Sequence, residues 1–169
     1  ALHAMEVSYL ENSQKEMLIT RPIKFQEITV DDKNLLKTLQ EAQADSNGVY
    51  TCLFTLKNND FFKKDFPDHS VRRIKGVSLQ ISCDGADYVN AELAVTKPAS
   101  CDTFATSTAV SDNGNFNFDF RSASYEIFEG VSLEDQTNWT LNITLPNGIG
   151  ADKINSATLF INYTARKNQ

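Results

Sequence analysis

The chain has 169 residues and a formal net charge of −6, from 16 basic and 22 acidic side chains. A chain of this length fits one domain, or one domain with a short appendage. It can bury enough surface to fold without the help of disulfide bonds or metal ions. The acidic balance argues against a general nucleic-acid binder, because such a protein needs a basic surface to displace counterions. We therefore expect no nucleic acid among its partners.

The cysteines Cys52, Cys83 and Cys101 are too few for a disulfide framework, and their number is odd. Cys83 and Cys101 could pair, but buried thiols in a reducing compartment are the simpler interpretation. No apolar run approaches the ~20 residues that span a bilayer, so we expect no direct membrane insertion. No signal peptide is visible, and because the chain begins at Ala1 we expect a piece of a longer protein.

Residues 1–13 are predicted to be the end of a helical linker. Leu2, Met5, Tyr9 and Leu10 follow a helical spacing that gathers them on one face. A helix this short is marginal alone, so it would pack on the domain or continue a longer helix. Residues 14–169 are then expected to form a β-sandwich binding domain.

The segment from Met17 to Val30 favours one or two strands, with Pro22 at an edge or a bend. Residues 31–45 are predicted to form an internal helix that Asp31 or Asp32 caps and that Asn47-Gly48 ends. Its apolar stripe contains Leu35, Leu36, Leu39 and Ala42.

From Val49 onward, alternation with a period of two dominates the sequence. The strand over residues 49–56 is apolar on both faces and could be buried on both. Asn113-Gly114 is a strong hairpin signal, whereas Asp84 to Asp87 favours a turn over a calcium loop. The inward sets of the later strands are Val77/Leu79/Ile81/Cys83, Val89/Ala91/Leu93/Val95, Phe116/Phe118/Phe120, Trp139/Leu141/Ile143/Leu145 and Ala157/Leu159/Ile161/Tyr163. These short strands and turns predict a mostly β fold, an antiparallel β-sandwich with a short N-terminal helix and one internal helix.

The sequence shows no catalytic centre. Asp68, His69 and Ser70 are neighbours, but a nucleophilic triad needs its base held between nucleophile and orienter in space, and adjacent turn residues mostly point apart. No pair of cysteines or histidines has the spacing of a metal site. We expect no enzyme activity, no metal and no cofactor.

One segment combines aromatic and cationic residues, which are enriched at protein interfaces. Its interface candidates are Phe61, Phe62, Phe66, Arg72 and Arg73. The alternative is a core loop in which the Phe side chains are buried and Arg72 pairs with Asp65 or Asp68.

Residues 62–83 read FKKDFPDHSVRRIKGVSLQISC. This run resembles the C-terminal region of the A subunit of bacterial Tc (toxin complex) insecticidal toxins, where the pattern is roughly D-F-P-G-H-Y-x-R-R-I-K-x-V-S-x-x-I-P-C. The segments MEVSYLE from Met5, YEIFEG from Tyr125 and LFINYTAR from Leu159 are similar to family segments in the same order. Asp68, Ser70 and Ile127 depart from the family pattern.

The resemblance implies a non-catalytic assembly domain that binds TcB. Five copies would form a funnel at the mouth of a pentameric pore, onto which the TcB-TcC cocoon docks. It also implies a domain made in the cytoplasm and then secreted, or displayed at the cell surface, within a larger bacterial toxin. The isolated domain is expected to be monomeric or weakly associated, because tethering raises the effective concentration of neighbouring copies.

Two other classes of function stay open. A carbohydrate-binding sandwich could use polar strand residues beside an aromatic ring, with Asn115, Asn117, Asp119 and Tyr125 as candidates. A hydrolase would need a clustered pair of carboxylates in a cleft.

Overall fold

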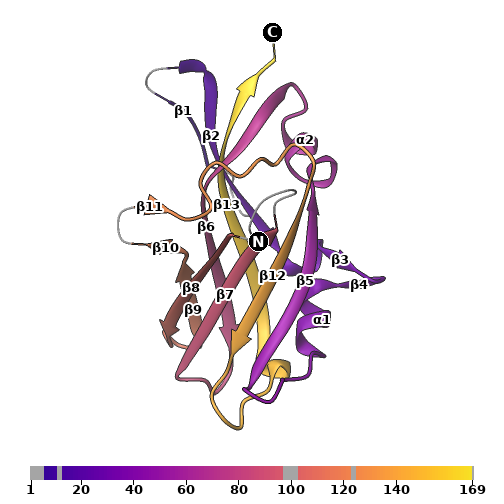
Figure 1. Ribbon diagram of the computed structural model, residues 1–169, viewed down its shortest axis with the longest axis vertical. Helices are drawn as coiled ribbons and strands as arrows, with labels where there is room; N and C mark the ends of the chain where they lie inside the picture. The colour runs from indigo at the N-terminus through magenta and orange to yellow at the C-terminus, as the bar shows by residue number, and fades with distance from the viewer. Residues whose placement is uncertain (1–5, 11–12, 97–102, 123–124, 169) are drawn as a thin grey trace.

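Two antiparallel sheets face each other across an apolar core (Figure 1). This computed structural model describes residues 6–10, 13–96, 103–122 and 125–168. The five-stranded sheet has the order β1-β2-β13-β6-β9, and the four-stranded sheet has the order β5-β12-β7-β8. The mostly β antiparallel sandwich predicted from the sequence is confirmed.

The strands of the five-stranded sheet are β1 (Glu6–Leu10), β2 (Ser13–Lys24), β6 (His69–Cys83), β9 (Asn115–Asp119) and β13 (Ile154–Lys167). Those of the four-stranded sheet are β5 (Val49–Lys57), β7 (Tyr88–Thr96), β8 (Thr103–Val110) and β12 (Gln136–Thr144). The short elements are β3 (Thr29–Val30), β4 (Lys33–Asn34), β10 (Arg121–Ser122), β11 (Tyr125–Glu126), α1 (Leu35–Gln40), α2 (Phe62–Asp65), η1 (Phe25–Glu27), η2 (Asn58–Asp60) and η3 (Ala151–Lys153).

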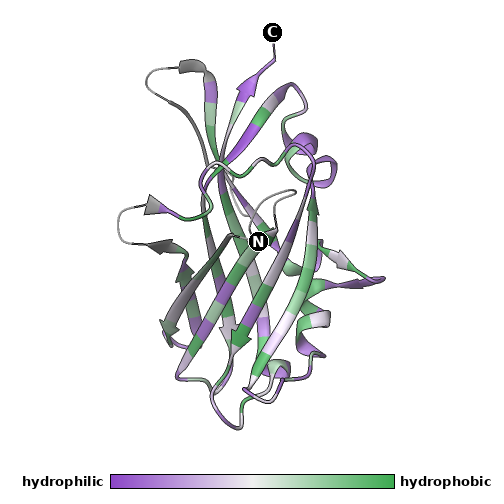
Figure 2. Cartoon of the chain, viewed as in Figure 1, coloured by the Kyte–Doolittle hydropathy of each residue, from purple (hydrophilic) through white to green (hydrophobic). Residues whose placement is uncertain are grey.

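Side-chain alternation builds the core between the sheets. Apolar and polar residues alternate along most strands (Figure 2), so each sheet turns one apolar face inward. Every inward set predicted for the strands after residue 76 is buried, and Trp139 stacks on Phe54 at 6.2 Å between ring centroids.

Strand β5 is buried on one face only, which corrects the expectation of two buried faces. Cys52, Phe54 and Leu56 point into the core, whereas the side chain of Leu53 is 64% exposed. The outer face of the four-stranded sheet is exposed at Leu53 and at Phe104. A run of apolar residues does not by itself show whether one face of its strand or both faces are covered.

Residues 6–10 form strand β1, so the predicted N-terminal helix is wrong over this stretch; residues 1–5 lie outside the described part of the chain. Glu6 pairs with Thr20, and the register continues antiparallel along β2. The edge of β2 offers backbone partners to every residue of β1, whereas a helix of this length is marginal.

Pro22 lies in β2 beyond Thr20, where the pairing of β1 with β2 starts. Among the described residues, the partner of Pro22 is Phe160 of β13, and the residues before Glu6 lie outside the described part of the chain. Proline has no N–H to donate, so it fits a strand position that has a neighbour on one side. The edge or bend predicted at Pro22 stays a prediction.

The internal helix exists, but α1 is shorter than predicted and has a different cap. Asn34 caps it, with its side chain accepting a hydrogen bond from the Lys37 amide at 2.8 Å. Asp31 and Asp32 instead form the turn between β3 and β4, where both have positive φ. The apolar stripe Leu35, Leu36 and Leu39 is buried as expected.

Turns form at both predicted places. Asn113 and Gly114 have φ values of 55° and 85° and turn between the bridged residues Asp112 and Asn115. The expected hairpin is not formed, because this turn links β8 of one sheet to β9 of the other. Residues 84–87 connect β6 to β7, and Gly85 takes a positive φ there.

Candidate interaction surface

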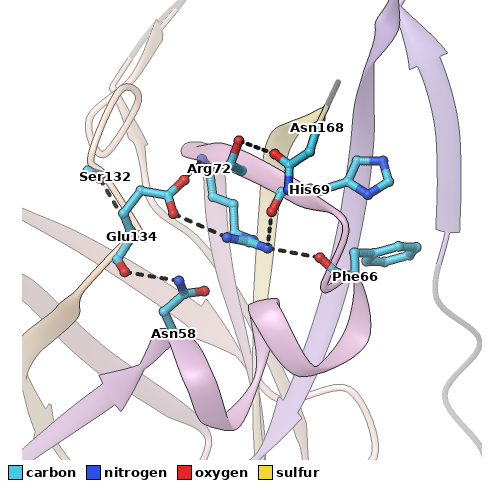
Figure 3. A network of polar contacts seen from close by, with 8 residues as sticks. Asn58, Phe66, His69, Arg72, Ser132, Glu134 and Asn168 are labelled. Carbon is cyan, nitrogen blue, oxygen red and sulfur yellow. Dashed lines mark hydrogen bonds and ion pairs between the residues drawn. The ribbon is translucent and has the colours of Figure 1, made fainter.

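One end of the sandwich is organised around the buried side chain of Arg72. We call this region the α2 end: residues 58–74, 130–135 and 163–168. The Arg72 guanidinium donates to the carbonyl oxygens of Phe66 at 2.9 Å and His69 at 2.6 Å (Figure 3). It also pairs with Glu134 at 3.1 Å, and its side chain is 2% exposed. One cation therefore joins the loop after α2, strand β6 and the segment before β12.

Glu134 holds the other half of this network. Its carboxylate accepts from the backbone amide as well as the guanidinium of Arg72, and its carbonyl accepts from the Asn58 side chain at 2.9 Å. The segment around it runs beside β6, where Leu133 donates to the Arg72 carbonyl at 3.0 Å. The sequence pointed to Asp65 or Asp68 as the partner of Arg72; a partner 62 positions away carries no local sequence signal.

The backbone of β6 bulges at Val71. Val71 has a φ of 54°, a conformation that β-branched residues rarely adopt, and the register between β6 and β13 shifts there. Arg72 alternates in phase with the buried Ile74, and the bulge changes the phase before it, so that His69 is buried as well. The side chain of Val71 itself is 45% exposed.

The aromatic interface candidates mostly belong to the core. Phe61 and Phe62 are buried, and Phe62 packs edge-on against Tyr163 with 5.0 Å between ring centroids. Phe66 is partly buried and packs against the core. The structure thus places Phe61, Phe62 and Arg72 inside the α2 end, where they support its surface and are not part of it.

A second ion pair fixes α2 to the five-stranded sheet. Arg21 of β2 donates to Asp65 at 2.7 Å, and its guanidinium lies 5.7 Å from the centroid of the Phe61 ring. Burial, with Asp65 as a further cause, raises the pKa of the neighbouring Tyr163 hydroxyl. Asp65, the other carboxylate suggested for Arg72, is therefore committed to Arg21.

Asp68, His69 and Ser70 do not form a triad. His69 Nδ1 lies 2.9 Å from Asp68, and this contact is the main cause that lowers the pKa of Asp68. Ser70 instead donates to the Asn168 side chain at 2.7 Å. The hydroxyl is thus engaged away from the imidazole. This bond, together with the Asn168 amide donating to the Asp68 carbonyl at 2.8 Å, joins the residue after β13 to the start of β6.

The exposed side chains of the α2 end carry more positive than negative charge. They include five cations, namely Lys63, Lys64, Arg73, Arg166 and Lys167, and three acids, namely Asp60, Asp68 and Asp135. Asp65 and Glu134 of the same region are paired with Arg21 and Arg72. The exposed charge of this end is thus slightly positive, on a chain of net charge −6.

A groove of about 610 Å³ lies on the outer face of the five-stranded sheet. Its lining includes Asn117, Asp119, Glu126, Phe160 and Asn162. A second hollow of about 360 Å³ adjoins it and shares Gln80 and Asn117 with it. We call the two together the outer groove.

Three of the four carbohydrate candidates lie at the outer groove. Asn115, Asn117 and Asp119 are exposed on the outward face of β9, and all three line it. Tyr125 is in β11, and its side chain is not described. Asp119 and Glu126 also place two carboxylates in this groove, which is the feature that the hydrolase alternative requires. Sequence reasoning did not find Phe160 or Glu126, because the register of β13 and the placement of β11 bring them there.

The two described thiols are internal. Cys52 and Cys83 are free and buried, and burial raises the pKa of Cys52 to about 11. Cys101 lies outside the described residues, so its pairing with Cys83 stays a prediction. Within the described ranges, no group of three or more His, Cys, Asp or Glu side chains could hold a metal ion. No described helix is both long enough and apolar enough to cross a membrane.

Comparisons with known proteins place this fold in a family context. A family model described as the Tc toxin complex TcA C-terminal TcB-binding domain matches residues 1–100. No curated protein matches the chain. The cryo-EM structure of Yersinia pseudotuberculosis TcaA-TcaB matches with a TM-score of 0.59 and 20% identity over 93% of this chain. At that identity the likeness shows the fold alone.

The chain spans 10% of the length of that Yersinia chain. Two viral proteins also match. Desmodium yellow mottle tymovirus covers 92% of this chain and 90% of its own, with 7% identity and a TM-score of 0.37. The extra small virus of the giant freshwater prawn Macrobrachium rosenbergii covers 97% of this chain and 85% of its own, with 10% identity and a TM-score of 0.29. Neither score is high enough to support an argument.

Proposed function

Because the chain belongs to the family of TcA C-terminal TcB-binding domains, we propose that it docks a TcB-like subunit of a toxin cocoon onto a Tc-type A subunit. The family match over residues 1–100 carries this proposal. We also propose that the domain acts without catalysis, as part of a larger bacterial toxin that leaves the cytoplasm after synthesis.

The α2 end is the surface that we assign to docking. It contains residues 62–74, the first part of the run 62–83 that resembles the family pattern, and it is fixed by the Arg72 network. Its exposed cations, among them Lys63, Lys64 and Arg73, would meet an acidic patch on the partner. Opposite potentials across an interface steer association and select the partner.

Charge reversal tests the docking surface. The double variant Lys63→Glu/Lys64→Glu should lower affinity for a purified TcB-like subunit about tenfold, mostly through slower association at low salt. Both side chains are exposed on α2, so the fold should survive. Lys153→Glu, an exposed lysine of η3, is the matched control and should leave the affinity unchanged. Equal effects of the two variants, or none, would remove this end from the interface.

We further propose that five copies assemble into a funnel when the domain is attached to its full-length subunit. Tethering raises the effective concentration of neighbouring copies, so weak contacts between domains are enough. Sedimentation of the isolated chain should show a monomer or weak association, whereas the full-length subunit should be a pentamer. A tight dimer of the isolated chain would contradict this assembly.

A further inference from the structure

We propose that the outer groove is a binding site for a neutral oligosaccharide. This inference goes beyond the docking function and does not rest on it. It starts from the register of the five-stranded sheet, which sets one cross-strand row as Pro22, Phe160, Ser78 and Asp119. The half-buried ring of Phe160 is thereby placed next to hydroxyl and carboxylate groups.

An aromatic ring beside polar groups matches the two kinds of surface on a sugar. The apolar face of a pyranose can lie on Phe160, while its hydroxyls point toward the neighbouring rows. Those rows supply Asn162 on one side of Phe160 and Gln80 with Asn117 on the other. The groove extends along β9 and β13 past Asn115 and Ser156, which gives room for more than one sugar unit.

Several polar side chains of the groove are available to a ligand. Among the described residues, Ser78, Gln80 and Asn117 make no side-chain hydrogen bond, whereas Asn162 accepts from the Thr20 hydroxyl at 3.3 Å. On the outer face of the four-stranded sheet, similar polar side chains bond one another: Thr51 donates to Asn142 at 2.7 Å, and Asn142 donates to Glu92 at 2.9 Å. The side chains of Gln80 and Asn117 are thus positioned by the sheet and still open to a ligand.

The carboxylates favour a neutral ligand over an acidic one. Asp119 and Glu126 line the groove, and each already interacts with another group of the chain. A carboxylate offers about four acceptor positions, so each can still accept from a sugar hydroxyl. Lys75, the lining cation, donates to Glu129 at 2.7 Å. A sulfated or sialylated chain would meet like charges here.

Gly76 shows that the groove wall has a required shape. A Cβ at this position would lie 3.1 Å from the carboxylate of Glu126. The Glu126 side chain therefore lies over the β6 backbone at Gly76, and it lines the groove together with Asn162.

The experiment uses the 169-residue chain and an array of immobilised neutral and acidic oligosaccharides, followed by calorimetric titration with the best neutral one. We expect binding to neutral chains and at least tenfold weaker binding for Asn117→Ala and for Asp119→Asn. Both side chains are exposed on edge strand β9, so these variants should fold. Asn138→Ala, on the outer face of the four-stranded sheet, is the matched control and should bind normally.

Four outcomes would overturn the proposal: no binding to any oligosaccharide at millimolar concentration, a preference for acidic chains, equal loss in the Asn138→Ala control, or cleavage of the bound sugar. A fifth outcome would also overturn it: if the TcB-like subunit protects β9 from hydrogen exchange and no sugar binds, the groove binds a protein. Asn117→Ala and Asp119→Asn should leave affinity for the TcB-like subunit unchanged, so failure of the docking proposal and failure of this one are distinguishable.

Discussion

The α2 end and the outer groove differ in how their sequence relates to their surface. The α2 end contains the most recognisable run of the chain, yet Phe62 and Arg72 are buried there. The outer groove also takes residues from outside that run, such as Asn115, Asn117 and Ser156, and these are exposed. A distinctive motif in this protein therefore reflects the demands of folding one end, whereas an ordinary alternation builds the larger hollow.

The physical reason lies in what each region must satisfy. At the α2 end a buried cation needs a carboxylate and several carbonyls at defined places, so many residues are constrained together. In the outer groove each residue needs only to alternate outward from a strand whose other face is apolar. Three variants separate these two situations, and each is measured by urea denaturation.

Arg72→Met should have the largest effect. It removes the partner of Glu134 and leaves the carbonyls of Phe66 and His69 without their donor. We expect the free energy of unfolding to fall by about 3 kcal/mol. The exposed neighbour Arg73 is the control: Arg73→Met should change the free energy of unfolding by less than about 0.5 kcal/mol. Similar small losses for both variants would mean that the buried network does not hold the α2 end together.

Gly76→Ala should have an intermediate effect. The added methyl group would crowd the carboxylate of Glu126 at 3.1 Å, so we expect a loss of about 1 kcal/mol. The double variant Gly76→Ala/Glu126→Ala should recover most of that loss, because the crowded group is then absent. If the double variant is as unstable as the sum of the single ones, Glu126 does not lie over Gly76 in solution.

Val71→Asn should have the smallest effect, and it should be favourable. Asparagine tolerates the left-handed conformation that Val71 adopts at φ 54°, and the half-exposed valine loses little burial. We expect a gain of about 0.5 kcal/mol in the free energy of unfolding. A loss of stability would show that Val71 does not take the left-handed conformation in solution.

The strands could be predicted because side-chain alternation is local. Phe116, Phe118 and Phe120 show their common face within five positions. The dipeptide Asn113-Gly114 predicts a two-residue turn from its two residue types alone. The errors fall where the environment overrides a local pattern. Leu10 and its neighbours in β1 have helical spacing but pair with the free edge of β2. Leu53 is apolar and was predicted to be buried, but it lies on the exposed face of β5.

The candidate sites follow the same division. Asn115, Asn117 and Asp119 could be found because their outward face is visible in the alternation of β9. Phe160 and Glu126 could not, because they reach the groove through the register of β13 and the placement of β11. The interface candidates Phe61, Phe62 and Arg72 are buried, because the sequence does not distinguish residues of a surface from residues that support it.

The amino-acid sequence by itself determined the mostly β class, the inward faces of most strands, the main turns and the family motif, because each depends on residues close together in the chain. Tertiary structure alone decided that Arg72 pairs with Glu134 and that Phe160 lies beside Ser78 and Asp119. Those contacts join strands distant in sequence, and their geometry depends on register, bulges and which sheet face is covered.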